Sequence, residues 1–370
     1  MNSSLPAALP PGSPTPEISI IVPARNEEAS LGDCLASLTS QSGVAFEIIV
    51  VDDASTDRTR AIAESFAGVR VISSGPLPQD WKGKNNALVA GAKEARAQWL
   101  LFTDADTVHL PGSLAQALVE AKHQQADLLS YSPQQVVVTF AERAVMPVIF
   151  AELAAHYPPH KVREQSAEIV AANGQYILVR RAVYEAVGGH AAVATEILED
   201  VALARLFRNV GQRVYFRYGG DAVRTRMYRN WAQLREGWTK NLALLFPQPE
   251  FLTFQSLTVW VAAWSTLAIA VAGITSRHLV WLLSAVFWLF VYRRIRAAHF
   301  ATANNLLAMA FGLPMFAYLL IRSKKAHASG QVSWKDRTYA TGAPSKGTST
   351  GMQAPKAIPT VENQRLRTEN

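Results

Sequence analysis

The sequence predicts an α/β fold in which a mostly parallel sheet is flanked by helices and is followed by apolar C-terminal segments. Up to residue 209, short apolar runs of strand length alternate with segments of helical periodicity. This alternation is typical of βαβ units, whose strands run parallel. From Phe251 the character changes, because three long apolar runs follow one another: 251–273, 278–292 and 303–321. Together these observations predict one large α/β domain followed by a membrane-associated region.

The individual elements follow from local patterns. Apolar runs of strand length lie at residues 18–22, 46–51, 69–72, 99–102, 127–130 and 177–179. A helix is expected where Leu31, Leu35 and Leu38 recur at helical spacing. Further helices are predicted over residues 84–97, 111–125 and 201–209. In parallel sheets of this kind, ligands bind at the carboxyl ends of the strands, so the site is expected along that edge.

The composition indicates membrane contact. Hydrophobic residues make up 49% of the 370 residues and charged residues only 18%. The net charge is +7, and two basic groups, 293–296 and 322–325, lie beside apolar runs, which favours membrane-flanking charge over a nucleic-acid interface. If all three apolar runs crossed a bilayer, these two basic groups would lie on opposite sides of it, although basic residues beside membrane segments tend to lie on the cytoplasmic side. We therefore expect one run to be re-entrant or interfacial, the third being the best candidate because it holds Gly312 and Pro314.

The predicted organisation has four parts. Residues 1–16, rich in Pro, Ser and Ala, are expected to be a disordered leader with no signal peptide. Residues 17–250 form the α/β domain, 251–325 a membrane region of two or three helices, and 326–370 a cytosolic or flexible tail. The single cysteine, Cys34, excludes an internal disulfide.

Acidic residues follow two of the predicted strands. Asp104 and Asp106 come directly after the strand at 99–102, and Asp52 and Asp53 end the strand at 46–51. Side chains two residues apart on an extended backbone point to the same side, so Asp104 and Asp106 can converge on one site. A Mg²⁺ ion is bound through one or two carboxylates and otherwise by water and substrate phosphates. Each pair of aspartates alone also fits a polar turn or a helix cap. Because both pairs are expected at the same edge of the sheet, a site for a metal and phosphate groups is favoured.

These residues, taken together and in order, resemble glycosyltransferase family 2, the inverting sugar-nucleotide transferases with the GT-A fold. The matching segments are Ile20-Ile21-Val22-Pro23-Ala24-Arg25-Asn26-Glu27, Val50-Val51-Asp52-Asp53-Ala54-Ser55-Thr56-Asp57, Gly83-Lys84-Asn85-Asn86-Ala87-Leu88, Phe102-Thr103-Asp104-Ala105-Asp106 and Glu199-Asp200. The C-terminal apolar runs followed by Trp334-Lys335-Asp336-Arg337-Thr338-Tyr339 resemble the membrane-bound branch that glycosylates lipids such as ceramide, hopanoids and carotenoids.

The resemblance implies roles for individual residues. Pro23, Ala24 and Glu27 would line the nucleotide pocket, where Asp53 would accept a hydrogen bond from uracil. Lys84 would lie near the base or diphosphate, Asp104 would face the ribose or the metal, and Asp106 would ligate Mg²⁺ or Mn²⁺. Asp200 would be the general base, with Glu196 and Glu199 as nearby competitors, and Glu199 is a candidate for acceptor contact.

One departure from the family concerns processive members, which carry Gln-x-x-Arg-Trp. Here Gln233, Arg235 and Trp238 occur at altered spacing. Arg235 or Lys240 would reach a phosphate and Trp238 would close over the sugar, or the segment is an amphipathic helix on the membrane surface. The altered spacing favours single-sugar transfer over polymer synthesis.

The sequence thus predicts a non-processive, metal-dependent hexosyltransferase of the inner membrane, multi-pass, with its catalytic domain facing the cytoplasm. Its partners would be a UDP-sugar donor, a lipid acceptor with a hydroxyl or carboxyl group, and the bilayer, with no nucleic acid. Two alternatives stay open: transfer to a polyprenyl phosphate, and a non-catalytic membrane protein that senses nucleotide sugars. A Rossmann dehydrogenase is disfavoured, because Pro23-Ala24-Arg25-Asn26 stands where Gly-x-Gly-x-x-Gly would follow the first strand.

Overall fold

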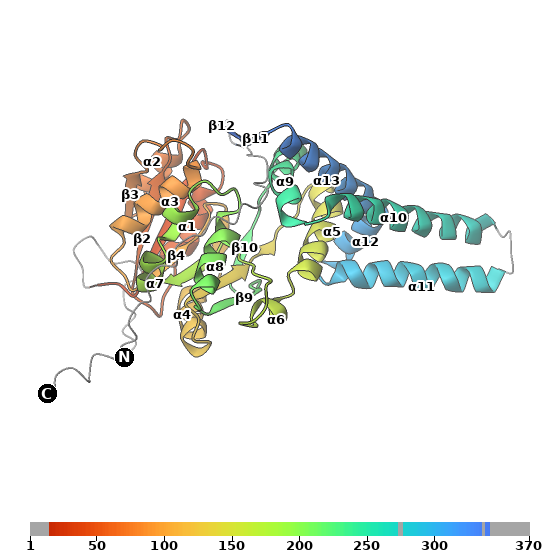
Figure 1. Cartoon of the computed structure of the whole chain (residues 1–370), viewed down its shortest axis with the longest axis horizontal. Coiled ribbons are helices and arrows are strands. Elements are labelled where there is room, and N and C mark those ends of the chain that lie inside the picture. Colours follow the sequence, from red (N-terminus) through yellow and green to blue (C-terminus); the bar gives the residue numbers. More distant parts are fainter. Residues whose placement is uncertain (1–14, 273–276, 335–336, 341–370) are drawn as a thin grey trace, which may run out of the picture.

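The computed structural model describes residues 15–272, 277–334 and 337–340. The predicted leader lies almost wholly outside these residues, as do residues 341–370 of the predicted tail. Figure 1 shows an α/β domain on one side, a group of helices in the middle, and two long helices that project away from both.

A seven-stranded sheet forms the centre of the α/β domain, in the order β3-β2-β1-β4-β8-β6-β9. Strands β1 to β4 run parallel, whereas β8 pairs antiparallel with both β4 and β6. The predicted α/β class with a mostly parallel sheet is confirmed. The strands are β1 (Ile18–Ala24), β2 (Phe46–Asp52), β3 (Val69–Ser73), β4 (Trp99–Phe102), β6 (Leu128–Ser132), β8 (Ile177–Arg180) and β9 (Val214–Tyr218).

Helices cover both faces of this sheet because alternate strand residues are apolar on either side. Ile20 and Val22 of β1 face the cluster that includes α1 and α4, whereas Ile21 faces the cluster with α3 and α8. Helix α3 lies so close that a Cβ at Gly91 would clash with Ile21. The helices are α1 (Leu31–Thr39), α2 (Thr59–Glu64), α3 (Gly83–Glu94), α4 (Ser113–His123), α7 (Arg181–Ala186), the 3₁₀ helix η1 (Gly189–Val193) and α8 (Glu199–Asn209).

A second, small sheet lies next to the end of β4. It consists of β5 (Thr107–His109), β10 (Val223–Thr225) and β7 (Gln134–Gln135), in the order β5-β10-β7. Strand β10 pairs antiparallel with β5, which directly follows Asp106. The sheet thereby fixes the backbone just beyond the two aspartates.

The remaining helices form the middle group and the projection, held together by a third apolar cluster. Helix α13 packs against α9 and α10, and Gly312 lies so close to α5 that a Cβ there would meet the carbonyl oxygen of Ala144. The elements are α5 (Phe140–His156), α6 (Pro159–Val162), α9 (Trp231–Leu245), α10 (Pro249–Ala272), α11 (Arg277–Arg296), α12 (Thr302–Leu307), the π-helix η2 (Ala308–Gly312), α13 (Leu313–Ala328) and the hairpin β11 (Gln331–Trp334) with β12 (Arg337–Ala340).

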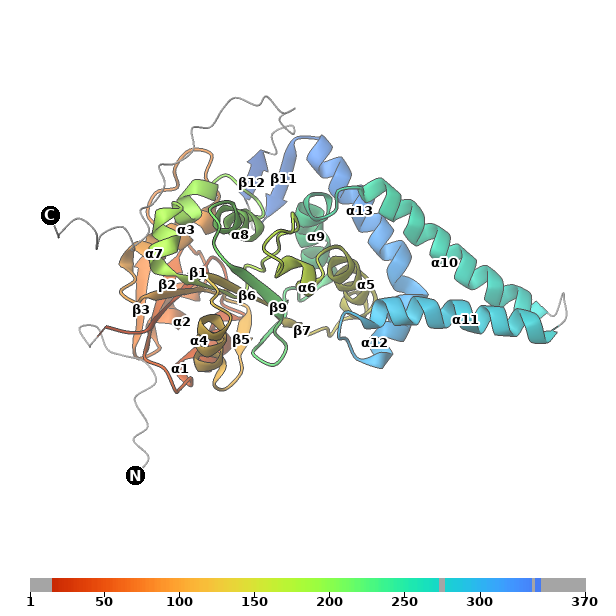
Figure 2. The same ribbon diagram turned by 60° about the horizontal axis from the view of Figure 1, so that its bottom comes forward.

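Helices α10 and α11 project as an antiparallel pair (Figures 1 and 2). At 1.5 Å per residue, 24 and 20 residues give lengths of about 36 and 30 Å. Their apolar side chains face outward: Phe254 and Val271 of α10 are each 70% exposed, and Leu282 of α11 is 60% exposed. Two helical stretches in the described residues, Pro249–Ala272 and Thr302–Ala328, are long and apolar enough to cross a membrane, and the second is half buried in the protein.

Because α11 returns to the base of the projection, both basic groups lie at the same end. Arg294 forms an ion pair of 2.7 Å with Glu152 of α5. Lys324 near the end of α13 pairs with Glu250 at the start of α10. In the described residues the two basic groups thus do not lie on opposite sides of the projecting helices, as three crossings of a bilayer would require. Helix α13 and the β11–β12 hairpin also continue into residues 326–340, which the sequence assigned to the tail.

Candidate active site

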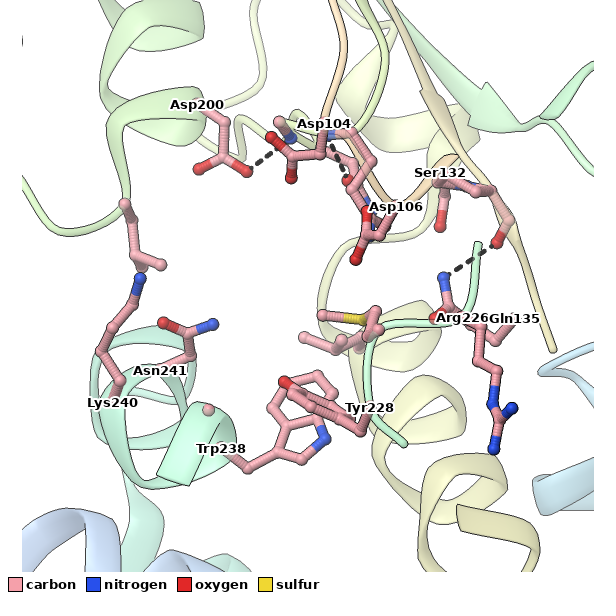
Figure 3. Close-up of a pocket in the computed structure, with 18 of the residues that line it drawn as sticks. Asp104, Asp106, Ser132, Gln135, Asp200, Arg226, Tyr228, Trp238, Lys240 and Asn241 are labelled. Atoms are coloured by element: carbon pink, nitrogen blue, oxygen red, sulfur yellow. Dashed lines mark hydrogen bonds between the residues drawn. The ribbon is translucent and has the colours of Figure 1, made fainter. Parts of the chain in front are cut away.

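A cavity of about 720 Å³ lies between the carboxyl edge of the large sheet and helices α5 and α9. All of the predicted site residues line it except Arg235, which is absent from the described lining residues. Figure 3 shows the acidic side chains on one side of this space and the α9 residues on the other. The predicted residues on the lining are Pro23, Ala24, Glu27, Asp53, Lys84, Asp104, Asp106, Glu199, Asp200, Trp238 and Lys240.

Two loops bound the end of the cavity that holds Asp53, and they form hydrogen bonds with each other. Asn26 accepts a hydrogen bond of 2.9 Å from the amide of Thr56, and its own amide donates to Ser55 Oγ. Asp53 is buried, and one of its carboxylate oxygens accepts a bond of 3.0 Å from Ser74 Oγ. Ala54, next to it, has a φ of 55°, an uncommon conformation for a residue with a Cβ. Such strain is typical of functional loops that the surrounding structure holds rigidly.

Lys84 joins the two acidic motifs. Its ammonium group lies 2.8 Å from Asp104 Oδ1 and 2.8 Å from Glu199 Oε1. Burial lowers the pKa of Lys84, but the two carboxylates outweigh it and hold that pKa well above its ordinary value. Burial raises the pKa of Glu199, but the nearby Lys84 outweighs it and keeps the pKa of this carboxyl below its usual range. A Cβ at Gly174 would lie 3.0 Å from Lys84 Nζ, so glycine leaves room for this bridge.

A buried polar network holds the Asp104–Asp106 segment from behind. Thr107 Oγ1 donates to the carbonyl of Asp104 (2.6 Å), and Thr225 Oγ1 donates to the carbonyl of Asp106 (3.2 Å). His109 lies beside Thr107, and burial lowers its pKa to about 3, so its imidazole is neutral. Thr225 and His109 are not among the residues predicted from the sequence, because each lies in a strand of three residues, too short to give a periodic pattern.

Asp200 lies in the first turn of α8, on the same side of the space as Asp104 (Figure 3). Its two carboxylate oxygens accept hydrogen bonds from the amides of Gly174 (2.9 Å) and Val201 (2.8 Å). Burial, reinforced by the charge of Glu199, raises the pKa of Asp200 to about 6. A carboxylate with this pKa is suited to accept a proton near neutral pH. Glu196, the other competitor, is exposed and does not line the cavity within the described residues.

Helix α9 supplies the opposite wall. Lys240 and Asn241 extend toward Asp200, and Trp238 with Tyr228 forms the floor (Figure 3). Burial lowers the pKa of Lys240, although Glu199 nearby opposes this. The indole N–H of Trp238 donates to Met146 Sδ at 3.3 Å, so the ring is already fixed in the apolar cluster. Trp238 therefore forms part of a preformed floor.

The back of α9 is bonded to α13. Ser323 Oγ donates to the carbonyl of Thr239 (2.7 Å) and accepts from the amide of Ala243 (2.9 Å). These are the two groups that an undistorted α-helix would join directly. Arg322 Nε also donates to Thr239 Oγ1 (3.1 Å). The turn of α9 that carries Lys240 is therefore positioned by a helix of the C-terminal region.

The donor set fits a hard divalent cation that takes most of its ligands from the substrate. No cluster of three or more His, Cys, Asp or Glu side chains suited to a metal occurs among the residues that the structure describes. Asp104 and Asp106 provide carboxylate oxygens, the donor type that Mg²⁺ and Mn²⁺ prefer. Two carboxylates are enough for a cation bridging substrate phosphates.

Residues 19–188 match the family model described as glycosyl transferase family 2. The chain carries a family 2 glycosyltransferase domain. The predicted resemblance and the enzyme class, a glycosyltransferase, are thereby confirmed.

Similar proteins extend beyond that domain. The 4,4'-diaponeurosporenoate glycosyltransferase of Staphylococcus aureus (strain USA300) is 29% identical over 339 residues, which cover 87% of this chain and 88% of that relative. Among solved structures, the mannosyltransferase PcManGT from Pyrobaculum calidifontis, in complex with GDP-Man and Mn²⁺, is 16% identical and covers 88% of this chain and 90% of its own, with a TM-score of 0.44. S. aureus TarS 1–349, in complex with UDP-GlcNAc, is 16% identical over 89% of this chain and 98% of its own, with a TM-score of 0.41.

Proposed function

We propose that this glycosyltransferase moves a hexose from a UDP-sugar, with inversion, to the hydroxyl or carboxyl group of a membrane lipid, one sugar per acceptor. The observation that carries the proposal is the continuity of the cavity. One end holds Asp53, Asp104 and Asp106, and the other end is lined by apolar side chains of α5 at the base of the projecting helices. A polar donor and an apolar acceptor each find a matching surface in the same space.

The donor would lie along the carboxyl edge of the sheet. Asp53 and the loop around Asn26 would contact the uridine, and Asp104 and Asp106 would hold Mg²⁺ or Mn²⁺. When bound, the cation would neutralise the negative charge of the diphosphate. Lys84, which pairs with Asp104, and Lys240 of α9 both line this region and would add positive charge near the phosphates.

Asp200 would act as the general base. The acceptor oxygen attacks the anomeric carbon while the bond from that carbon to the diphosphate oxygen breaks, and UDP leaves. The acceptor proton moves to a carboxylate oxygen of Asp200, which the amides of Gly174 and Val201 hold in place. Attack on the face opposite the leaving group inverts the anomeric centre. The raised pKa of Asp200, about 6, and the position of Asp200 beside Asp104 support this assignment.

The acceptor class is supported by two independent features. The S. aureus relative, which is similar over 87% of this chain, is by its name a transferase to 4,4'-diaponeurosporenoate. The outward apolar surface of α10 and α11 favours insertion in a bilayer, where a lipid acceptor is already present. We infer that these two helices cross the inner membrane as a hairpin, that α13 lies at its cytoplasmic interface, and that the catalytic domain faces the cytoplasm.

The test uses the full chain in detergent with radiolabelled UDP-glucose or UDP-N-acetylglucosamine, host lipid extract and Mg²⁺ or Mn²⁺. Label is expected in the organic phase for the wild type, with loss on chelation, in Asp106→Ala and in Asp200→Asn. Transfer that survives Asp200→Asn would favour an acceptor that is already ionised, such as a polyprenyl phosphate. UDP-sugar binding without transfer to any lipid fraction would contradict the proposal and favour a sensing role.

A further inference from the structure

The end of the cavity farthest from Asp53 is lined by apolar side chains. They come from three separate segments that meet there: α5, the C-terminal turn of α9, and the link between α11 and α12. A sugar nucleotide consists of hydroxyl, phosphate and base groups and gains little from such a surface. These lining residues are Phe150, Leu153, Ala154, Leu245, Ala298 and Phe300.

The link from residue 297 to 300 fixes where this end opens. It follows Arg296, the last residue of α11, so it lies at the base of the projecting hairpin. Ala297 and His299 line the cavity and are also exposed, which locates an opening to the outside at this link. The opening therefore lies next to the part of the protein with the most exposed apolar surface.

Two contacts define the sides of the opening. The His299 ring stacks on Tyr218 of β9, with centroids 4.2 Å apart and planes 12° apart. The Tyr157 hydroxyl donates to the carbonyl of Leu245 at 2.5 Å, which joins the end of α5 to the end of α9. The apolar end is thus bounded by the α/β domain on one side and by α5 and α9 on the other.

We propose that this apolar end is the binding channel for the hydrocarbon chain of the acceptor, which enters sideways from the bilayer at residues 297–300. The inference rests on the proposed function and specifies its acceptor. An apolar channel that leads to a polar reactive end suits a lipid whose acceptor group terminates one extended chain. The chain lies along α5, and its terminal hydroxyl or carboxyl group reaches Asp200.

The test compares Ala154→Trp with the matched control Ala155→Trp. Ala154 lines the channel, whereas the next residue on α5 is exposed and lies outside the lining. The probe is palmitic acid bearing a photoactivatable diazirine, bound to the full chain in detergent, with crosslinks mapped by mass spectrometry. Crosslinks are expected on α5 and residues 297–300 in the wild type and in Ala155→Trp. If the indole excludes three methylenes, affinity in Ala154→Trp falls about sixtyfold, at roughly fourfold per methylene.

A second variant, Ala298→Trp, blocks the opening and covers the case in which Ala154→Trp does not fold. UDP binding, measured calorimetrically, is expected to be unchanged in all three variants, because the donor end is distant along the cavity. Equal crosslinking in Ala154→Trp, Ala298→Trp and Ala155→Trp, or loss of UDP binding in folded Ala154→Trp, would overturn the channel. Transfer of labelled sugar to host lipid is measured separately: transfer with no channel crosslink refutes the channel alone, and a channel crosslink without transfer refutes the proposed activity alone.

Discussion

Replacing Asp200 by asparagine removes the carboxylate and keeps the side-chain size, but the amide has a single acceptor oxygen, so it can keep only one of the two hydrogen bonds from the amides of Gly174 and Val201. General-base catalysis typically contributes about a hundredfold to ten-thousandfold, so kcat for a hydroxyl acceptor should fall by roughly that factor. Binding of UDP should change little, because Asp200 is not among the residues expected to contact the nucleotide or the metal. Steady-state transfer with labelled UDP-sugar and calorimetric UDP binding measure the two quantities.

The pH dependence gives a sharper measurement. A base with a pKa of about 6 is ionised for about a tenth of molecules at pH 5 and about nine-tenths at pH 7. The rate for the wild type should therefore rise about tenfold between these values, because only the carboxylate accepts the proton. Glu199 raises the pKa of Asp200, so Glu199→Gln should move this rise to lower pH. Glu196→Gln, an exposed acid three positions earlier, should leave the profile unchanged.

Either of two results would show that Asp200 is not the general base. One is Asp200→Asn retaining more than about a tenth of the wild-type kcat, since even a weak base contributes more. The other is a rise between pH 5 and 7 that persists unchanged in Asp200→Asn. Both would locate the proton acceptor in a different group.

Three further predictions concern the surroundings of the site. Lys84→Met leaves the carboxylates of Asp104 and Glu199 facing each other without a cation, so UDP affinity, measured calorimetrically, should fall by about tenfold. Lys84→Arg should retain more of that affinity, and equal affinities in Lys84→Met and the wild type would argue against a role of Lys84 in donor binding. Gly312→Ala forces a methyl group onto the carbonyl of Ala144 and should cost about 1–3 kcal/mol of stability, seen as a lower Tm, and an unchanged Tm would contradict the close packing. Ser323→Ala removes a buried hydroxyl that makes two hydrogen bonds to α9 and should lower kcat, whereas Ser323→Thr, which keeps the hydroxyl, should restore kcat. Equal activities in the two variants would count against the positioning of α9 by Ser323.

Long, regular elements could be predicted from the sequence because each carries its own pattern. The buried runs that became β1, β2 and β4 and the apolar face of α1 were expected within a few residues of their observed bounds. Asp104 and Asp106 could be placed at one edge of the sheet because the carboxyl ends of parallel strands lie along the same edge.

The features that escaped prediction depend on residues far apart in the chain. Strands β5, β7 and β10 have only two or three residues, too few for a periodic signal, and they form because tertiary packing brings them together. The antiparallel direction of β8 is likewise set by the path of the chain. The bridge from Lys84 to both acidic motifs and the fixed position of Trp238 depend on packing that no local pattern encodes.

The contacts between α9 and α13 bear on whether the catalytic domain can be separated from the C-terminal helices. A change in composition at Phe251 suggests a boundary between a catalytic domain and an anchor. Ser323 and Arg322, however, bind the turn of α9 just before Lys240, and Phe316 of α13 packs in the same apolar cluster as Trp238. A chain shortened to end at Leu245 would lose these contacts and expose that cluster to water. We therefore expect the unit that folds and the unit that catalyses to be the same and to include helix α13.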